Sequence, residues 1–459
     1  MSDEGLRAAQ DKMRAAGVAA NAIDVFSHYY RELAQGATGL IREDTIAPVL
    51  DPPKLAEVTI DEARAESAFA RTAVIKLNGG LGTSMGMDRA KSLLPVRDDR
   101  TFLDVAMDQV RHARREHGVR LPLILMDSFR TSEQSLAAVR AHPDIEVAGL
   151  PLDFLQNQEP KLLAEGLTPV TWPADPSLEW CPPGHGDIYT AIQSSGVLDA
   201  LLEQGFRYAS VSNADNLGAA PSATLAGWFA ATGAPYAAEV CRRTPADRKG
   251  GHLAIRRSDG RLILRERAQT ADADMDFFTD EGRHPYFNSN NLWLDLEQVR
   301  AALVDRGSVL GLPLIRNTKT VDPTDPTSPA VVQIETAMGA AIEVFEGAQA
   351  IVVGRDRFLP VKTTDDLLVL RSDVFASASD GTLHVTSPTT PLVHLDPKHY
   401  RTIADFDARF PLGPPSLRQA TSLTVRGDWT FGADVVVVGD VELGDTGGSE
   451  QVPAGTRLS

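Results

Sequence analysis

The spacing of apolar positions along the chain predicts its main elements. Between residues 5 and 35, apolar and charged positions alternate as on one amphipathic helix, with Phe26, Tyr30 and Leu33 on a shared face. Further on, three short apolar runs end in polar or glycine turns, as buried parallel strands do. These runs are Thr72 to Leu77, Pro122 to Met126 and Tyr208 to Val211.

Helical patterns separate these predicted strands. Thr101 and Asp104 give one helix a suitable start. Its apolar face is formed by Phe102, Leu103, Ala106 and Val110, and a further helix is indicated by Ile188, Ile192 and Leu198. Alternating strands and helices predict a doubly wound α/β sheet, in which ligands bind outside the carboxyl ends of the strands.

The tail has a different period. Apolar residues recur at every sixth position, at Val425, Phe431, Val437 and Leu443. This hexapeptide period is typical of a β-helix, although so short a repeat leaves an ordinary pair of β-hairpins open. The approach from Ala376 to Pro415 is rich in proline, including Pro388, Pro391 and the run Pro411 to Pro415. We therefore expect a domain boundary near residue 385.

Composition is that of a soluble globular protein. The chain has 459 residues, more than one ordinary domain, with 43% hydrophobic and 23% charged residues. It contains no apolar stretch of membrane-spanning length, and the charged first forty residues contain no apolar signal-peptide core. The only cysteines, Cys181 and Cys241, are too few for a disulfide framework. We expect a cytoplasmic protein that does not bind membranes.

The net charge of −17 disfavours nucleic acid, because it repels a phosphate backbone. Any smaller phosphate ligand must therefore meet a local basic patch. We expect folding to bring this patch together from Lys76, Lys91, Lys319 and Lys362.

One segment is suited to phosphate binding. The run Lys76 to Gly86 reads KLNGGLGTSMG, follows a predicted strand and is answered by Lys91. Glycine-rich backbone can turn successive amides towards an anion, because no Cβ prevents close approach. A tight turn that binds no ligand remains possible from this run alone.

Two common phosphate motifs do not fit the run. The dinucleotide fingerprint requires glycine where Met85 stands, and the next glycine is Gly86. A Walker-type loop requires glycine directly before the Lys-Ser pair, where Ala90 stands. A nicotinamide-dependent enzyme and a P-loop kinase are therefore disfavoured.

Further motifs resemble one family, the eukaryotic-type UTP–glucose-1-phosphate uridylyltransferases, also called UDP-glucose pyrophosphorylases. Matching blocks follow in the same order over about two-thirds of the chain. They are Lys76 to Gly86, Trp180 to Tyr189, Val211 to Gly218, Lys249 to Gly251, Phe287 to Trp293, Asn317 to Asp322, Gln333 to Ile342 and Arg355 to Leu367.

The resemblance implies a fold and a division into domains. The fold would be a Rossmann-like, GT-A-like nucleotidyltransferase with a mixed sheet. It implies an N-terminal helical segment over residues 1–50, a catalytic domain over 51–384, and a short left-handed β-helix over 385–459.

The resemblance also implies a reaction. A phosphate oxygen of glucose 1-phosphate would attack the α-phosphorus of UTP, giving UDP-glucose and pyrophosphate with Mg²⁺ as cofactor. The attacking phosphate is already anionic, so no Ser-His-Asp nucleophile or strong base is needed. Catalysis would consist of holding two repelling anions in line and neutralising the developing charge.

Residue roles carry over by position. Lys91 and Lys362 would be catalytic cations on the phosphates, with Lys362 reaching the α-phosphate from the far side. The nucleotide-binding set would be Leu77, Asn78, Gly79, Gly80, Lys91, Gln156, Gly184, Asp215 and Lys362. The sugar-phosphate set would be His185, Asn213 and Asn290.

Asp215 would be the magnesium ligand, because one hard carboxylate at a strand end suffices when phosphates and water complete the octahedron. The alternative for Asn213 and Asp215 is an Asx turn that caps the next element. For His185, a residue that follows two prolines, the alternative is a structural role.

Three further expectations concern the loop before Lys91, the oligomeric state and the rival functions. Met87 to Ala90 departs from the family pattern, and Asp88 adds negative charge near an anionic ligand. The tail is shorter than in the animal enzymes, so a monomer or small homo-oligomer is expected. The rival functions are a pyrophosphorylase acting on N-acetylhexosamine 1-phosphate and a non-catalytic nucleotide-sugar sensor.

Overall fold

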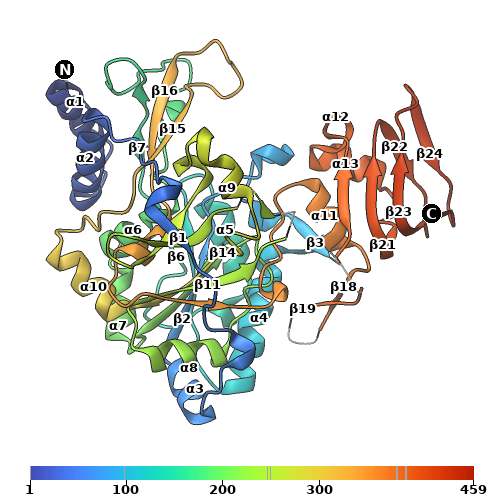
Figure 1. Ribbon diagram of the computed structural model, residues 1–459, viewed down its shortest axis with the longest axis horizontal. Coiled ribbons are helices and arrows are strands. Elements are labelled where there is room, and N and C mark those ends of the chain that lie inside the picture. The colour runs from blue at the N-terminus through green and yellow to red at the C-terminus, as the bar shows by residue number, and fades with distance from the viewer. Residues whose placement is uncertain (1, 98, 245–246, 249, 379–380, 388–389) are drawn as a thin grey trace.

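The computed structural model describes the chain except for residues 1, 98, 245–246, 249, 379–380 and 388–389. Lys249 of the glycine-containing block and Pro388 of the proline-rich approach therefore lie outside the described residues. Figure 1 shows a central body with the two N-terminal helices at one side and the C-terminal strands at the far end.

A mixed ten-stranded sheet forms the centre of this body (Figure 1). Its main path runs β1-β12-β14-β10-β2-β5-β6, while β13 pairs with β12, and β11 pairs with both β14 and β17. The strands are β1 (Ile46–Pro48), β2 (Thr72–Leu77), β5 (Leu123–Asp127), β6 (Asp153–Leu155), β10 (Tyr208–Asn213), β11 (Tyr236–Arg242), β12 (His252–Arg256), β13 (Leu262–Arg265), β14 (Tyr286–Asp295) and β17 (Gln349–Val352).

The three predicted strands are confirmed as β2, β5 and β10, and they are parallel neighbours. Leu77 lies opposite Asn213 on one side and Met126 on the other, so the three strands end at one edge of the sheet. β14 runs antiparallel to β10 and makes the sheet mixed. Loops that follow β2, β5 and β10 therefore meet at this edge.

Helices cover both faces of the sheet. Alternate residues of β2 point to opposite sides: Ala73 and Ile75 pack in one apolar core, and Val74 packs in the other. The first core includes residues of α1, α2, α6, α7 and α10, and the second includes residues of α3, α4, α5 and α8. The helices not given below are α3 (Glu62–Phe69), α5 (Ser132–Arg140), α8 (Ala223–Thr232), α9 (Met275–Thr279), α10 (Leu296–Asp305) and α11 (Thr364–Arg371).

The N-terminal segment forms two helices, and the expectation of one helix over residues 5–35 is wrong. α1 (Ser2–Ala15) and α2 (Ala20–Ala34) lie side by side (Figure 1). Gly17 has φ of 73°, and the Val18 amide donates to the Met13 carbonyl at 3.0 Å. This left-handed glycine cap ends α1, whereas the apolar spacing alone continues through it.

The helix predicted after Thr101 is confirmed as α4 (Phe102–His117). The Thr101 hydroxyl accepts from the Asp104 amide, and the Asp104 carboxylate accepts from the Thr101 amide, which forms a capping box. The apolar positions after residue 188 belong to two helices, α6 (Ile188–Ser194) and α7 (Val197–Glu203). Gly196, with φ of 77°, separates them.

The tail consists of parallel strands, so the hairpin alternative is wrong. β20, β21, β23 and β25 form one parallel sheet, and β22 and β24 form another. Strands from β21 onwards alternate between the two sheets, which is the connectivity of stacked coils. The elements are β20 (Leu392–Leu395), α12 (Pro397–Tyr400), α13 (Ile403–Arg409), β21 (Ser416–Val425), β22 (Asp428–Phe431), β23 (Val436–Leu443), β24 (Ser449–Val452) and β25 (Arg457–Leu458).

Short strands complete the fold. β15 and β16 project from the body as a hairpin (Figure 1), and β8 extends this hairpin to three strands. The remaining strands are β3 (Pro95–Arg97), β4 (Arg100–Thr101), β7 (Glu159–Pro160), β8 (Leu162–Leu163), β9 (Trp180–Cys181), β15 (Ile315–Thr320), β16 (Ala330–Glu335), β18 (Phe375–Ser377) and β19 (Leu383–Val385). Among the helices that the structure describes, none is long and apolar enough to cross a membrane.

Candidate active site

The glycine-rich run forms a closed loop at the carboxyl end of β2. The Lys91 amide donates to the Gly80 carbonyl at 3.1 Å, and Leu81 pairs with Ala90 in an isolated bridge. Gly82 packs so closely on Met87 that a Cβ at this position would lie 2.5 Å from the Met87 sulfur. The loop therefore closes on itself and returns the chain to Lys91.

Asn78 differs from the rest of the predicted nucleotide set, because its side chain faces the protein interior. Its amide nitrogen donates to Asp127 at 2.7 Å and to Ser135 at 2.8 Å, and the residue is buried. Burial, opposed by hydrogen bonds from Asn78 and Thr131, raises the pKa of Asp127 to about 7. Asn78 can therefore meet a ligand through its main chain only, and its side chain fixes the start of the loop.

Three residues of the predicted nucleotide set lie next to one another in the structure, although they come from separate loops: Gly79, Gln156 and Gly184. A Cβ on Gly79 would lie 2.8 Å from the Gln156 side-chain oxygen, so glycine allows this approach. The Gln156 amide nitrogen donates to the Gly184 carbonyl at 2.9 Å. Gly184 has φ of 79°, and a Cβ there would lie 2.5 Å from the Thr336 carbonyl oxygen.

His185 is held in one tautomer. Its Nδ1 accepts a hydrogen bond from the Met338 backbone amide at 3.0 Å. Burial lowers the pKa of His185 to about 4, so the ring is neutral near pH 7 and carries its proton on Nε2. Nε2–H is therefore a fixed donor for an anionic or hydroxyl oxygen, which favours the predicted contact over a purely structural role.

Lys91 connects three loops at this edge of the sheet. Its ammonium forms an ion pair with Asp215 at 2.6 Å and donates to the Val361 carbonyl. Asp215 follows β10, and Val361 precedes Lys362. The predicted cation, the predicted metal ligand and the segment carrying the second predicted cation therefore adjoin one another.

Lys362 is exposed, while its backbone is well anchored. Its amide donates to the Asp366 carboxylate at 2.7 Å, and Asp366 also completes a capping box with Thr363 at the start of α11. Within the described part of the chain, the Lys362 ammonium has no hydrogen bond or ion pair. Burial raises the pKa of Glu266, and the charge of Lys362 opposes this shift, which places the two groups near each other.

Sequence reasoning did not single out Glu266. Its carboxyl group lies within 2.6 Å of the position that a Cβ would take on Gly251, so the glycine block beside Lys249 leaves room for it. The Gly250-Gly251 pair was therefore a visible feature of the sequence, but the sequence does not show that Glu266 packs against it.

A buried polar network supports these loops from beneath. Glu239 forms a bidentate ion pair with Arg357, at 2.8 and 2.9 Å, and accepts further hydrogen bonds from Trp293 and Asn291. Burial acts to raise the pKa of Glu239, but Arg357 and these hydrogen bonds outweigh it and hold the pKa below its usual value. The network was missed because charged residues are rarely buried.

Asn216 links the network to the site. Its side chain donates to Asn291 at 3.0 Å and to the Arg357 carbonyl at 3.2 Å, and it accepts from the Leu359 amide at 2.8 Å. The segment that carries Asp215 is therefore bonded to the segment that leads to Lys362. Asn216 lies in the Val211 to Gly218 block, so its position was visible in the sequence but its role was not.

Asn290 lies at an irregularity in β14. The register between β11 and β14 shifts there, since Glu239 pairs with Asn291 while Val240 pairs with Asn288. Asn290 has φ of 59°, and its side chain accepts from Asn288 at 2.8 Å. Bulges and left-handed residues of this kind concentrate at functional sites, where they redirect a side chain.

The expected four-lysine patch is wrong in one member, Lys76, whereas the part of Lys319 in it stays a prediction. Lys76 is buried, and its ammonium donates to Ser212 at 2.9 Å and to the Ala219 carbonyl at 3.0 Å. Burial and the nearby Arg357 lower the pKa of Lys76 to about 7. Lys319 lies on the projecting hairpin, 3.7 Å from Glu335. Alternating side-chain direction along β2 explains Lys76, since its neighbours Ile75 and Leu77 take the other face.

The Asp215 site fits a cation that takes most of its ligands from substrate and water. In the residues that the structure describes, no group of three His, Cys, Asp or Glu side chains could hold a metal by itself. Lys91 occupies Asp215 Oδ2, and no described residue hydrogen-bonds to Oδ1. One free carboxylate oxygen suits Mg²⁺, which usually retains waters and binds phosphates.

Comparisons with known proteins identify the family. The fold first places the chain among mixed α/β proteins, with a glycine-rich loop at the carboxyl end of β2. A family model described as UTP–glucose-1-phosphate uridylyltransferase matches residues 23–438. The chain belongs to this family.

Individual relatives agree with the assignment. A probable UTP–glucose-1-phosphate uridylyltransferase from Schizosaccharomyces pombe is 37% identical over 432 residues, covering 92% of this chain and 82% of the relative. The UTP–glucose-1-phosphate uridylyltransferase of Saccharomyces cerevisiae is 37% identical, covering 88% of this chain and 80% of its own.

Solved structures show the same fold. The UDP-glucose pyrophosphorylase of Leishmania major has 41% identity and a TM-score of 0.93, with 99% of this chain and 98% of the other covered. A mutant of that enzyme, solved in complex with UDP-glucose, has 42% identity, a TM-score of 0.92 and the same coverage.

Proposed function

We propose that this chain transfers the uridylyl group of UTP to glucose 1-phosphate and releases pyrophosphate. The observation that carries the proposal is the double contact of Lys91, with the Asp215 carboxylate and with the Val361 carbonyl beside Lys362. This contact joins a cation, a carboxylate and the segment of Lys362 at the end of a glycine loop, which supports a site for phosphates. The named activity of the relatives supports the same reaction.

The nucleotide would lie along the loop after β2. The main chain of Leu77 to Gly80 and the Gln156 side chain would hold its base and ribose, and Gly184 allows close approach. Lys91 would contact the triphosphate. Atoms of Gln156 and Thr336 fill the space that a Cβ would take on Gly79 and Gly184, so glycine at these positions lets the surrounding loops pack closely.

The sugar phosphate would be held from the opposite side by His185, Asn213 and Asn290. The neutral His185 ring offers Nε2–H to a phosphate or hydroxyl oxygen, and this donor does not titrate near pH 7. Lys362, exposed and free of ion pairs among the described residues, is available to the α-phosphate. The chain would thus orient one oxygen for in-line attack.

The residues act by position and charge. Lys91 and Lys362 would approach the phosphates from two loops and balance the charge that develops as pyrophosphate departs. Asp215 would hold Mg²⁺, which would supply a further positive charge against the developing negative charge. No side chain needs to remove a proton, because the attacking oxygen is already anionic.

Several further features belong to the proposal. The sheet would be that of a GT-A-like nucleotidyltransferase, and the stacked parallel coils after residue 385 would be left-handed. The domains would be 1–50, 51–384 and 385–459, and the protein a cytoplasmic monomer or small homo-oligomer. Parallel pairing of β21, β23 and β25 supports the β-helix part.

A substrate panel tests the proposal directly. Purified protein is incubated with each nucleoside triphosphate and each sugar 1-phosphate, with and without Mg²⁺, and pyrophosphate is measured. We expect release only with UTP, glucose 1-phosphate and Mg²⁺ together. Turnover with N-acetylhexosamine 1-phosphate instead would select the rival pyrophosphorylase. Binding of UDP-glucose without any turnover would select the sensor.

A further inference from the structure

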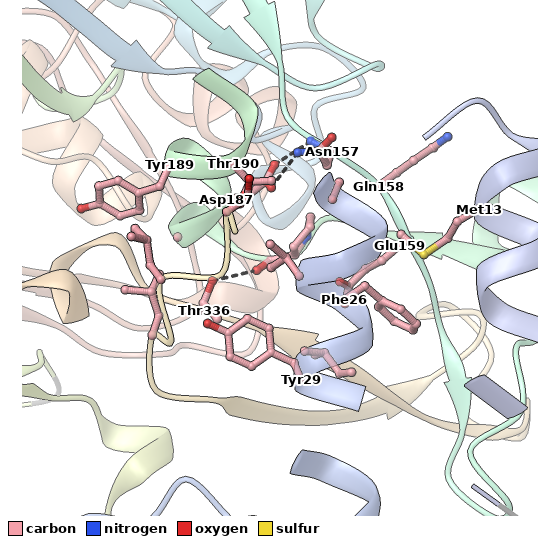
Figure 2. A pocket seen from close by; sticks show the side chains of 18 residues that line it. Met13, Phe26, Tyr29, Asn157, Gln158, Glu159, Asp187, Tyr189, Thr190 and Thr336 are labelled. Atoms are coloured by element: carbon pink, nitrogen blue, oxygen red, sulfur yellow. Dashed lines mark hydrogen bonds between the residues drawn. The ribbon is translucent and has the colours of Figure 1, made fainter. Parts of the chain in front are cut away.

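A mostly enclosed cavity lies between the N-terminal helices and the segment that carries His185 (Figure 2). Its interior has room for only a few water-sized molecules, about 30 Å³ measured at their centres. One wall is apolar and includes Met13, Phe26 and Leu312. The lining also contains the carboxyl groups of Glu159 and Asp187. None of the proposed substrate-binding residues lines this cavity, so it is separate from the candidate active site.

Glu159 is the unusual group in this cavity. It is 3% exposed, and its Oε1 atom is buried without a hydrogen-bond partner. Figure 2 shows its side chain reaching from β7 towards Phe26 of α2. Burial, with the nearby carboxylates of Asp187 and Glu335, raises the pKa of Glu159 well above its usual value. A buried carboxyl group with an unused oxygen is costly unless something binds to it.

Asp187, the second carboxyl group, already has hydrogen-bond donors for both of its oxygens. Its two oxygens accept from the Asn157 amide at 2.6 Å and from the Asn157 side chain at 2.8 Å, as the dashed lines in Figure 2 show. The cavity lining therefore offers one unused acceptor, Glu159 Oε1, beside the carboxyl groups of Asp187 and Glu335. A cationic donor would supply the missing hydrogen bond and would stabilise negative charge on these carboxyl groups.

We propose that this cavity is a binding site for a small aliphatic amine of about four to six non-hydrogen atoms. Its ammonium group would pair with Glu159, and its compact apolar body would lie against Phe26 and Leu312. On binding, the carboxyl proton of Glu159 passes to the solvent, so that a carboxylate meets an ammonium ion.

The cavity shares a wall with the site. Pro183 and Gly186 line the cavity, while Gly184 and His185 between them belong to the site. The Gly186 amide donates to the Thr336 carbonyl at 2.8 Å, and the Thr336 amide donates to the Pro183 carbonyl at 2.9 Å. Because this wall is thin and tightly bonded, an occupant that pushes on it displaces His185. Binding should therefore raise the KM for glucose 1-phosphate, a step that rests on the proposed function.

Binding is tested without substrates, using isobutylammonium chloride and its neutral isostere isobutanol at equal ionic strength. Thermal unfolding and calorimetry should show saturable binding of the amine, at least about tenfold tighter than binding of the alcohol, since a charge-assisted hydrogen bond is lost in the latter. Calorimetry in two buffers of different ionisation enthalpy should show release of about one proton.

Two variants address the site in different ways. Glu159→Gln removes the charge, with the exposed Glu165→Gln as control, and should weaken amine binding by about tenfold or more. Ala22→Leu fills the cavity from α2, with the exposed Ala20→Leu as control, and should abolish binding without a change in charge. Failure of one variant to fold leaves the other as the test.

The outcomes separate the two proposals. Absence of saturable amine binding, or equal binding by wild type and Glu159→Gln, overturns the site. Binding that leaves the KM for glucose 1-phosphate unchanged overturns the coupling through His185. Neither result bears on whether pyrophosphate is released from UTP in amine-free solution, which alone decides the proposed function.

Discussion

The buried ion pair between Glu239 and Arg357 provides a quantitative prediction. The Arg357 side chain is 11% exposed and that of Glu239 is 1% exposed, so the pair is almost shielded from water. In Arg357→Met, Glu239 keeps its hydrogen bonds from Trp293 and Asn291 but loses its ion-pair partner. Removing one partner of a buried pair typically costs about 3–5 kcal/mol, because the other charge stays buried without compensation.

The protein offers a matched control on its surface. Arg248 and Glu281 form the same bidentate pair, at 2.9 Å for both contacts, but their side chains are 53% and 30% exposed. Arg248→Met should therefore cost less than about 1 kcal/mol. Urea unfolding of both variants, followed by far-ultraviolet circular dichroism, measures the free energy of unfolding in each case.

A double variant tests the physical reason. Glu239→Gln removes the buried charge and retains an acceptor for Trp293, so the combination of Glu239→Gln with Arg357→Met should be about 1–3 kcal/mol more stable than Arg357→Met alone. Because the Arg357 segment leads to Lys362, turnover of the single variant should fall together with its stability. Equal stability of the single and double variants, or equal losses in Arg357→Met and Arg248→Met, would refute the reasoning.

Three further results are expected. Lys362→Ala should lower kcat by about 10²–10³-fold, while the free energy of unfolding changes by less than about 0.5 kcal/mol. The control is Lys398→Ala, at another exposed lysine. Wild-type turnover in Lys362→Ala would contradict the catalytic assignment. Burial lowers the pKa of His185 from 6.5 to about 4, so the folded state binds fewer protons than the unfolded chain between these values, and stability is lost as pH falls. Urea unfolding measures how far the free energy of unfolding falls between pH 7.5 and pH 5. This decrease should be up to about 2 kcal/mol smaller in His185→Gln than in wild type, and an equal decrease in both would count against a buried neutral ring. Asp88→Asn, at an exposed position, should change the KM for UTP by less than about fivefold, and a large loss of activity would mean that the carboxylate has an unassigned role.

Part of the fold followed directly from local patterns. β2, β5 and β10 are mostly buried, so each contains a short, largely apolar run that stands out in the sequence. The start of α4 was equally visible, because its capping box is contained in four adjacent residues. Such features depend on near neighbours only.

Other parts depend on contacts that no local pattern contains. β14 carries the polar run Asn288 to Asn291, which has little strand character, yet this run pairs with β11 because Glu239 and Asn216 supply its hydrogen-bond partners. Glu159 and Arg357 are charged and would be expected at the surface. Their burial becomes intelligible only once distant segments are placed together.

As with the fold, the sequence predicted only part of the candidate site. The glycine loop, Lys91 and Asp215 were predicted from the sequence, and they meet in the structure. The inward direction of Asn78 and the burial of Lys76 were not, since a residue at a strand end can face either way. The roles of the glycine loop, Lys91 and Asp215 in catalysis and binding stay predictions.

The contact of Lys91 with Val361 spans 270 positions of the chain. A ribosome adding about 5–20 residues per second needs roughly 15–50 s to cover that distance. During this interval the nascent glycine loop has emerged without the carbonyl that anchors its lysine. Substrates therefore cannot stabilise the growing polypeptide through a complete pocket, and translation must have passed the second lysine before they can.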